Sequence, residues 1–196
     1  MDFGKHKLIN FIQQNQPFLN ESQAREVAAF FNKQLISKGE VFVTKGKVSN
    51  AYYYMESGCV RSYTQNLDGE DVTTGLYSSH RVVCELTSFF KRVPAQESYQ
   101  ALSDCKMWHV SFENVQAAFH SLPEFREFGR ALLVNEYGAL KTRTLSTLHE
   151  TAEERYANLL KGSPDIFQYA PLKNIASYLG ITDTSLSRIR KEFAKK

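Results

Sequence analysis

The sequence predicts an α+β protein in which a β-rich segment lies between helices and a helix-turn-helix follows near the C-terminal end. Three observations predict this class. Short apolar runs recur roughly every ten residues between positions 41 and 110. Residues 125–148 contain no proline and many helix-forming residues, and residues 172–191 carry apolar residues at helical spacing on both sides of one glycine. Strands at this spacing predict a sandwich, a roll or a barrel.

The first segment, residues 5–35, has the pattern of helices. Its apolar faces are supplied by Ile9, Phe11, Ile12, Val27, Phe30, Phe31 and Leu35. Asn20 followed by Glu21 and Ser22 is a favourable start for the second helix, because a short polar side chain can cap the first free backbone N–H groups.

From Ser37 the apolar period changes to that of strands. The expected strands are residues 41–43, 51–55, 60–63, 72–74, 81–84, 98–101 and 106–110. Turn dipeptides separate several of them, at Lys38-Gly39, Lys45-Gly46, Ser57-Gly58 and Asp68-Gly69. We interpret the run Tyr52-Tyr53-Tyr54 as strand packing rather than as a platform on which bases stack.

After Ser111 the pattern is helical again. Residues 112–120 suit a short helix, and Pro123 begins a longer one. Val134, Leu145, Leu148 and Ala152 lie close to one heptad seam, which Gly138 and Lys141 interrupt. A long apolar helix in this position is either a dimerisation element or a buried helix of one monomer.

The C-terminal segment has the pattern of a helix-turn-helix. A capping box beginning at Thr151 predicts a helix over residues 153–161, and Pro171 suits the first turn of the next helix. Leu172, Ile175, Ala176 and Leu179 form one apolar face, and the small Ala176 lets two helices approach closely. Gly180 can adopt the positive φ that ends a helix, and Thr182 can cap a second helix with Asp183 in its first turn.

The second helix of this segment directs Leu186 and Ile189 toward the first. Its outward face carries Thr184, Ser187, Arg188 and Lys191, the short polar and basic side chains that reading a major groove requires. The alternative is an ordinary helical hairpin with a solvated face. The basic tail favours DNA, since five Lys or Arg and one Glu stand between Arg188 and Lys196.

The distribution of charge also predicts that a polyanion partner binds the C-terminal part of the chain. Residues 1–150 carry 16 basic and 16 acidic side chains, whereas residues 151–196 carry 8 and 5, which supplies the whole net charge of +3. No apolar run long enough to span a membrane and no signal peptide is visible, so we expect a cytoplasmic protein without a membrane partner.

The candidate groups for an enzyme or a metal site are few. Cys59, Cys84 and Cys105 are odd in number and widely spaced, so we expect three buried, reduced thiols rather than a zinc or iron–sulfur site. The five histidines form no ligand pair, and His109 is expected to be a satisfied structural histidine in a strand. Cys84 stands beside Glu85, but neighbours on a strand point to opposite faces. We therefore expect no enzyme.

The order of elements, with the segments Ala152-Glu-Glu-Arg-Tyr156, Pro171–Thr182 and Leu186–Arg190, resembles the cAMP-receptor/FNR (Crp/Fnr) family of transcription regulators over nearly the whole chain. These segments resemble most the branch of the family common in Bacteroidetes. The resemblance implies a cyclic-nucleotide-binding-like sensor built as a double-stranded β-roll over residues 1–122. A long dimerisation helix over residues 123–150 and a helix-turn-helix domain over residues 151–196 would follow it.

The resemblance assigns roles to residues of the helix-turn-helix. Arg188 matches the family's DNA-reading arginine, which can pair bidentately with guanine. Asp183 and Thr184 stand where the cAMP receptor has an arginine and a glutamate that face bases, so a different half-site is expected. Thr182, Ser185 and Lys173 match positions that touch phosphates, with Lys191 beside them. Only five residues follow Lys191, so we expect no full β-wing.

The resemblance also locates an effector pocket that has changed. Glu85 and Leu86 match the family's phosphate-binding cassette, but Cys84 replaces its glycine and Glu97, before Ser98, replaces its arginine. A carboxylate in place of a guanidinium repels a phosphate. We therefore expect weak or absent cAMP binding and no cofactor, unless Lys91 or Arg92 supplies the missing positive charge.

Two functions are consistent with these residues. The first is a homodimeric regulator that binds a near-palindromic operator in double-stranded DNA and has a degenerate or altered effector pocket. The alternative is a ligand-gated regulator that binds a cyclic nucleotide or another small molecule in the β-roll. RNA polymerase is a further candidate partner that the resemblance implies.

Overall fold

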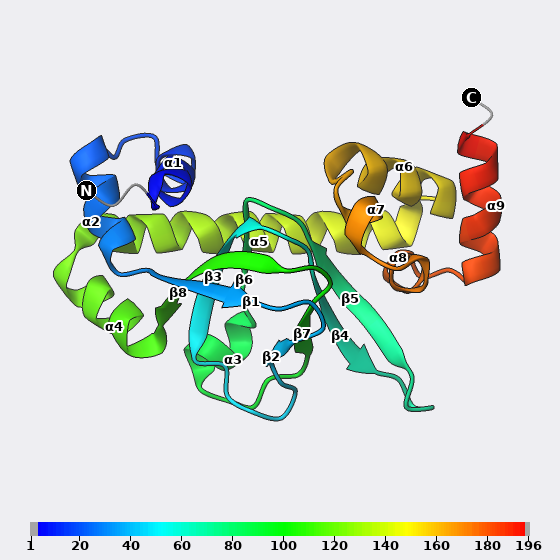
Figure 1. Cartoon of the computed structure of the whole chain (residues 1–196), viewed down its shortest axis with the longest axis horizontal. Helices are drawn as coiled ribbons and strands as arrows, with labels where there is room; N and C mark the ends of the chain where they lie inside the picture. The colour runs from blue at the N-terminus through cyan, green and yellow to red at the C-terminus, as the bar shows by residue number, and fades with distance from the viewer. Residues whose placement is uncertain (1–3, 195–196) are drawn as a thin grey trace.

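The computed structural model describes residues 4–194 (Figure 1). The helices are α1 (His6–Asn15), α2 (Glu21–Ala29), α3 (Leu86–Lys91), α4 (Phe112–Ser121), α5 (Pro123–His149), α6 (Ala152–Gly162), α7 (Ile166–Tyr169), α8 (Leu172–Leu179) and α9 (Asp183–Phe193). The strands are β1 (Asn32–Ile36), β2 (Val41–Val43), β3 (Ala51–Ser57), β4 (Val60–Gln65), β5 (Asp71–Tyr77), β6 (Arg81–Val83), β7 (Ser98–Ala101) and β8 (Cys105–Ser111).

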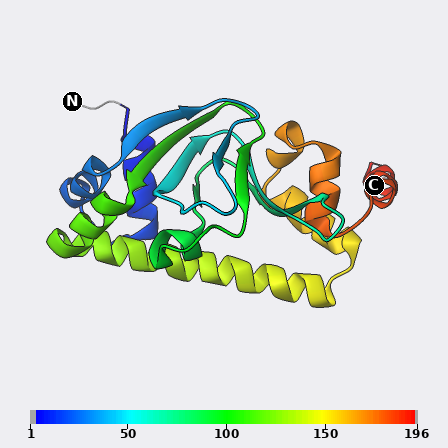
Figure 2. The same cartoon turned by 90° about the horizontal axis from the view of Figure 1, so that it is seen from below.

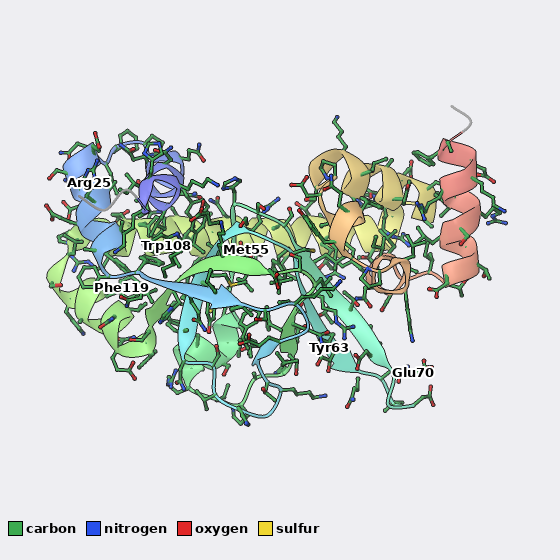
Figure 3. The ribbon with its side chains drawn as sticks, viewed as in Figure 1. Arg25, Met55, Tyr63, Glu70, Trp108 and Phe119 are labelled. Carbon is green, nitrogen blue, oxygen red and sulfur yellow. The ribbon has the colours of Figure 1, made fainter. Side chains whose placement is uncertain are left out.

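The strands form two four-stranded antiparallel sheets, in the orders β1-β8-β3-β6 and β2-β7-β4-β5. The chain crosses repeatedly from one sheet to the other, which is the winding of a jelly roll. The roll interior is apolar and includes Met55, Met107 and Tyr99, all buried, with Met55 labelled at its centre in Figure 3. The predicted α+β class with an N-terminal β-roll is therefore confirmed.

Helices cover the outer face of the first sheet. Tyr52, Tyr54 and Trp108 point out of the roll and pack with side chains of α1, α2, α4 and the first half of α5. The Phe11 ring of α1 stacks on Tyr54 with a centroid distance of 4.4 Å. The tyrosine run is thus strand packing, as expected.

Helix α5 joins the two ends of the molecule. It runs along the whole length of the roll and reaches the group α6–α9 at the other end (Figures 1 and 2). Phe125, Phe128 and Leu132 in its first half are buried, whereas Val134, Tyr137, Leu140 and Leu148 are exposed. Within residues 4–194, no helix is long and apolar enough to cross a membrane.

Helices α6–α9 share a third core that also includes residues of the roll. Tyr156, Ile175 and Leu186 pack there with Cys59 and Leu102. The C-terminal helices therefore do not stand apart from the β-roll. Thr151 begins α6 with the predicted capping box, because its side chain accepts the Glu154 N–H and the Glu154 carboxylate accepts the Thr151 N–H.

The helical interpretation of residues 5–35 is wrong at its end. Phe30 ends α2, and residues 32–36 form β1, which pairs with β8 from Asn32↔His109 to Ile36↔Cys105. Leu35, assigned to a helical face, is 68% exposed, whereas Ile36 is buried. Pairing with a strand about seventy residues away overrides a local pattern that was short and ambiguous.

Three smaller expectations also need correction. Ala152 is not part of the α5 seam, because α5 ends at His149 and Ala152 begins α6. Pro171 stands at the N-cap of α8 rather than in its first turn, and Leu172 is 40% exposed. The short helix α7 was not predicted, since four residues carry too little periodicity to detect.

Candidate nucleic-acid interface and effector pocket

Gly180 closes the turn between α8 and α9. Its φ is +68°, a conformation that L side chains rarely adopt. The Ile181 N–H donates to the Ala176 carbonyl at 3.0 Å, and the Gly180 N–H donates to the Ser177 carbonyl at 3.1 Å. This pair of bonds is a Schellman motif, and it sets the direction in which the chain leaves α8.

Thr182 begins α9. Its hydroxyl accepts the Ser185 N–H at 3.2 Å, and Asp183 lies in the first turn, where a negative charge is favourable. Leu186 and Ile189 are buried against Ala176 and Leu179 of α8. Apart from the exposed Leu172, the core of this pair is the one the sequence predicts, and it directs the other face of α9 to solvent.

The outward face of α9 gathers the predicted base-reading residues. One shallow, open groove is lined by Asp183, Thr184, Ser187, Arg188 and Lys191, all exposed. Within residues 4–194, no acidic side chain pairs with Arg188 or Lys191. Both cations are therefore free to meet a polyanion.

Of the four predicted phosphate contacts, Lys191 lines this groove, whereas Lys173, Thr182 and Ser185 do not. The Thr182 hydroxyl donates to the Ser185 hydroxyl at 3.0 Å, so the two side chains are engaged at the start of α9. Lys173 lies on α8 in a second hollow, together with Arg61, Glu70, Asp71, Asn174 and Ser177. The structure thus groups Lys173 with carboxylates of the β-roll.

Two arginines that sequence reasoning did not single out hold α8 in place. The Arg155 guanidinium donates to the Leu179 carbonyl at 2.9 Å and to the Glu150 carbonyl at 2.6 Å. Arg143 of α5 lies over the Tyr178 ring at 4.2 Å and donates to the Tyr178 carbonyl at 3.5 Å. Arg155 stands inside the motif Ala152–Tyr156, which was the available signal for its role.

The residues of the predicted effector pocket are largely engaged by the protein itself. Glu85 is buried, and its carboxylate caps α3 by accepting the Ser88 N–H. The Ser98 hydroxyl accepts the Lys45 N–H at 2.9 Å. Leu86 packs at the edge of the core under the first sheet. Burial and the neighbouring Glu85 raise the pKa of the Cys84 thiol, which holds it in the neutral form.

Two tyrosines occupy the roll interior next to this segment. The Tyr99 hydroxyl donates to the Cys84 carbonyl at 3.2 Å, and the Tyr99 ring stacks on Tyr77 with a centroid distance of 6.0 Å. Gly75 makes room for Tyr77, because a Cβ at position 75 would stand 2.8 Å from the Tyr77 hydroxyl. Large neutral side chains therefore fill space beside Cys84.

Two carboxylates act on Tyr77 through their negative charge. Burial, with smaller effects from Glu97 and Glu136, raises the pKa of Tyr77 to about 12. Glu97 precedes β7 and lines an open hollow with Lys45 and Thr64. Glu136 belongs to α5, is half-buried, and has its own pKa raised by burial, which Arg81 partly offsets. Sequence reasoning missed Glu136, since nothing local shows which face of α5 meets the roll.

Arg92 does not replace the positive charge that the predicted pocket lacks at Glu97, because its guanidinium is bound elsewhere. It adopts a left-handed φ of +56° after α3, donates to the Ser49 carbonyl at 2.9 Å and to the Asn50 side chain, and lies 4.2 Å over the Phe112 ring. Lys91 ends α3 and is exposed. The positive charges closest in sequence to Glu97 are thus bonded elsewhere or in solvent.

The cysteines and His109 show no metal geometry. Cys59, Cys84 and Cys105 are free thiols, and Cys84 is only half-buried by its exposed area. No group of three potential metal ligands exists among residues 4–194. His109 differs from expectation, because its Nδ1 is buried without a hydrogen-bond partner and is not satisfied.

Known proteins are similar to the β-roll by itself and to most of the chain. Residues 33–121 match the family described as "Cyclic nucleotide-binding domain". The fumarate and nitrate reduction regulatory protein of Vibrio cholerae is 26% identical over 194 residues, covering 91% of this chain and 76% of the relative. Electron transport regulator A of Shewanella oneidensis is 25% identical over 177 residues, covering 83% of this chain and 69% of the relative.

Solved structures share the fold. FixK2 from Bradyrhizobium japonicum superposes with a TM-score of 0.70 at 20% identity, covering 84% of this chain and 85% of that one. The c-di-GMP responsive global regulator CLP of Xanthomonas campestris superposes with a TM-score of 0.69 at 15% identity, covering 90% and 92%.

A cyclic-nucleotide-binding β-roll joined through one long helix to a helix-turn-helix defines a class of bacterial transcription regulators. Residues 33–121 match the cyclic nucleotide-binding domain, and most of the chain is similar to regulators such as the fumarate and nitrate reduction regulatory protein, whose relatives of the Crp/Fnr type share this fold.

Proposed function

We propose that this chain is a sequence-specific DNA-binding transcription regulator whose effector pocket does not take cAMP. The open groove on α9 carries the proposal, because it gathers Asp183, Thr184, Ser187 and Arg188 on one exposed helical face. Arg188 supplies the guanine contact, and the neighbouring Asp183 and Thr184 select the adjacent bases. Contacts to the DNA phosphates position α9 in the major groove, and they come from Lys173, Thr182, Ser185 and Lys191.

We propose that the active form is a homodimer paired through α5. Val134, Tyr137, Leu140 and Leu148 are 59%, 66%, 64% and 77% exposed, an unusual burden of apolar surface for one helix. One flank of α5 lies at the edge of the molecule and is covered by no other element (Figure 2). Two recognition helices must then meet major grooves about 34 Å apart, so the operator should be a near-palindrome.

The pocket chemistry supports the proposal that cAMP is not the effector. Glu97 and Glu136 present negative charge to Tyr77, where an anionic phosphate would require a cation. Two other residues of the predicted pocket already have partners in the protein: the Cys84 carbonyl accepts the Tyr99 hydroxyl, and the Glu85 carboxylate accepts the Ser88 N–H. RNA polymerase as a partner and the absence of an enzymatic activity remain predictions.

A second candidate is a regulator gated by a cyclic nucleotide or another small molecule bound in the roll. The match of residues 33–121 to the cyclic nucleotide-binding domain favours this candidate, because the domain is named for binding a ligand. The two candidates differ in whether DNA binding changes with ligand.

One selection experiment tests both. The purified full chain is used to enrich sites from random double-stranded DNA, with and without cAMP, cGMP and cyclic di-GMP. We expect a near-palindromic consensus with equal enrichment in all arms. A consensus that appears only with one nucleotide supports the gated regulator instead, and no enrichment in any arm contradicts DNA binding as the function.

A further inference from the structure

The hairpin of β4 and β5 is bound to the first helix of the helix-turn-helix. Arg61 of β4, whose side chain is 12% exposed, donates to Asp71 at 2.9 Å, to Gln100 at 2.9 Å and to the Asn174 side chain at 3.4 Å. Its guanidinium also lies 4.1 Å over the Tyr63 ring. An arginine held on four sides fixes the position of Asn174 relative to the roll.

Strand β5 gives this contact a second anchor. It is the last strand of its sheet, so one edge of its backbone has no strand partner. The Thr73 N–H on that edge donates to the Ser177 hydroxyl at 2.9 Å. Helix α8 thereby covers a sheet edge and is bonded at two successive turns, at Asn174 and at Ser177.

The contact places carboxylates beside the predicted phosphate-binding lysine. Lys173 shares one hollow with Glu70 and Asp71 of the hairpin and with Asn174 and Ser177. Glu70 lies near the hairpin tip, which projects past α8 below α9 (Figures 1 and 3). Within residues 4–194, no ion pair joins Lys173 to either carboxylate, and Asp71 is paired with Arg61. The two carboxylates therefore act across the hollow, where their negative charge opposes a DNA phosphate at Lys173.

We propose that the negative charge of Glu70 and Asp71 opposes a DNA phosphate at Lys173, so that the conformation with the hairpin bound to α8 holds DNA weakly. This inference rests on the proposed function. For DNA to bind, either the hairpin leaves the N-terminal part of α8, or its two carboxylates stay next to the DNA backbone and repel the phosphates. The hairpin belongs to the sensor domain, so this contact links that domain directly to the DNA-binding helices.

The experiment compares two double variants with the same change in net charge. Glu70→Gln/Asp71→Asn removes the two carboxylates beside Lys173. Glu26→Gln/Asp68→Asn removes one charge from exposed α2 and one from the turn of the same hairpin, outside the hollow. Affinity for a selected operator and for random DNA is measured for the wild type and both variants from about 0.05 to 0.3 M salt.

We expect Glu70→Gln/Asp71→Asn to bind both DNAs about tenfold more tightly than the control variant near 0.1 M salt, with a salt slope steeper by about 1 because Lys173 gains a phosphate. Equal affinity and slope in the two variants would overturn the proposal. Hydrogen exchange without DNA reports the contact separately, and residues 172–179 should exchange faster only in Glu70→Gln/Asp71→Asn.

The two readouts separate the proposals. If no variant binds any DNA, the proposed function fails, while exchange still shows whether Asp71, through its pair with Arg61, helps to hold α8. If α8 exchanges faster but DNA affinity does not exceed that of the control, the contact exists and its charge does not oppose DNA, which overturns the inference alone.

Discussion

The backbone N–H of Thr73 donates to the Ser177 hydroxyl at 2.9 Å, and this bond joins the edge strand of the β-roll to the first helix of the helix-turn-helix across 104 residues of sequence. Arg61 and Asn174 make the neighbouring contact. The β-roll and the helix-turn-helix therefore meet through contacts that substitutions can test.

Replacing Arg188 with alanine should relax specificity at one base pair per half-site. A bidentate arginine–guanine contact is worth about 1–3 kcal/mol of discrimination. Among the residues that line the groove on α9, Arg188 is the arginine. Competition binding against single-base operator variants measures the change. Arg188→Lys should recover charge but little discrimination, since an ammonium lacks the planar fork. Unaltered base preference in Arg188→Ala would show that Arg188 does not read a base.

Replacing Lys173 with alanine should weaken binding to all DNA sequences alike. A lysine on a phosphate carries no base information, and its loss should flatten the salt slope by about 1. Binding to operator and random DNA over a salt series measures both effects. Lys106→Ala on β8, an exposed lysine of the sensor domain, serves as the charge-matched control. A changed preferred sequence in Lys173→Ala would contradict the phosphate role.

Isothermal titration should detect no micromolar binding of cAMP to the wild type. Glu97→Arg introduces a guanidinium, but the negative charge of Glu136 still acts on Tyr77. The double variant Glu97→Arg/Glu136→Gln should therefore bind cAMP more tightly than Glu97→Arg alone, and Glu97→Gln should not bind. Micromolar affinity for cAMP in the wild type would contradict the prediction and favour the ligand-gated regulator.

Replacing Gly180 with alanine should destabilise the C-terminal helices by about 1–2 kcal/mol, the cost of a left-handed conformation for an L side chain. No atom lies within 4 Å of the added Cβ, so the cost is conformational rather than steric. Gly162→Ala is the control, because that site has equal space and no positive φ. Chemical denaturation monitored by circular dichroism measures both, and equal stabilities would mean that the turn tolerates another conformation.

Replacing Glu136 with glutamine should stabilise the fold at neutral pH. Burial raises the pKa of Glu136 in the folded protein above its usual value of 4.5, so ionisation opposes folding as pH rises through the folded value. Below the unfolded pKa both states are protonated, and the advantage of the variant should vanish. Urea unfolding across about pH 4 to 8 measures this trend against the exposed control Glu26→Gln. A constant difference at all pH values would assign the effect to packing.

Local patterns predicted the helix-turn-helix almost residue by residue. Gly180, Thr182, Leu186 and Ile189 act through neighbours within about two helical turns, and such short-range signals survive in a single sequence. Local patterns failed at residues 32–36, where pairing with β8 decides the structure. They also missed Glu136, because the face that α5 turns to the roll depends on packing far from its own sequence.

By itself, the sequence determined the order of the helical and β-rich segments, the turn at Gly180 and the outward set around Arg188, but not the strand β1 or the short helix α7. The features that it determined depend on spacing, capping and charge, which neighbouring residues encode. Only the tertiary structure decided that Lys173 lies beside Glu70 and Asp71, and that Tyr99 fills space next to Cys84. Contacts between residues far apart in the chain form when sheets and helices pack, and no local pattern records them.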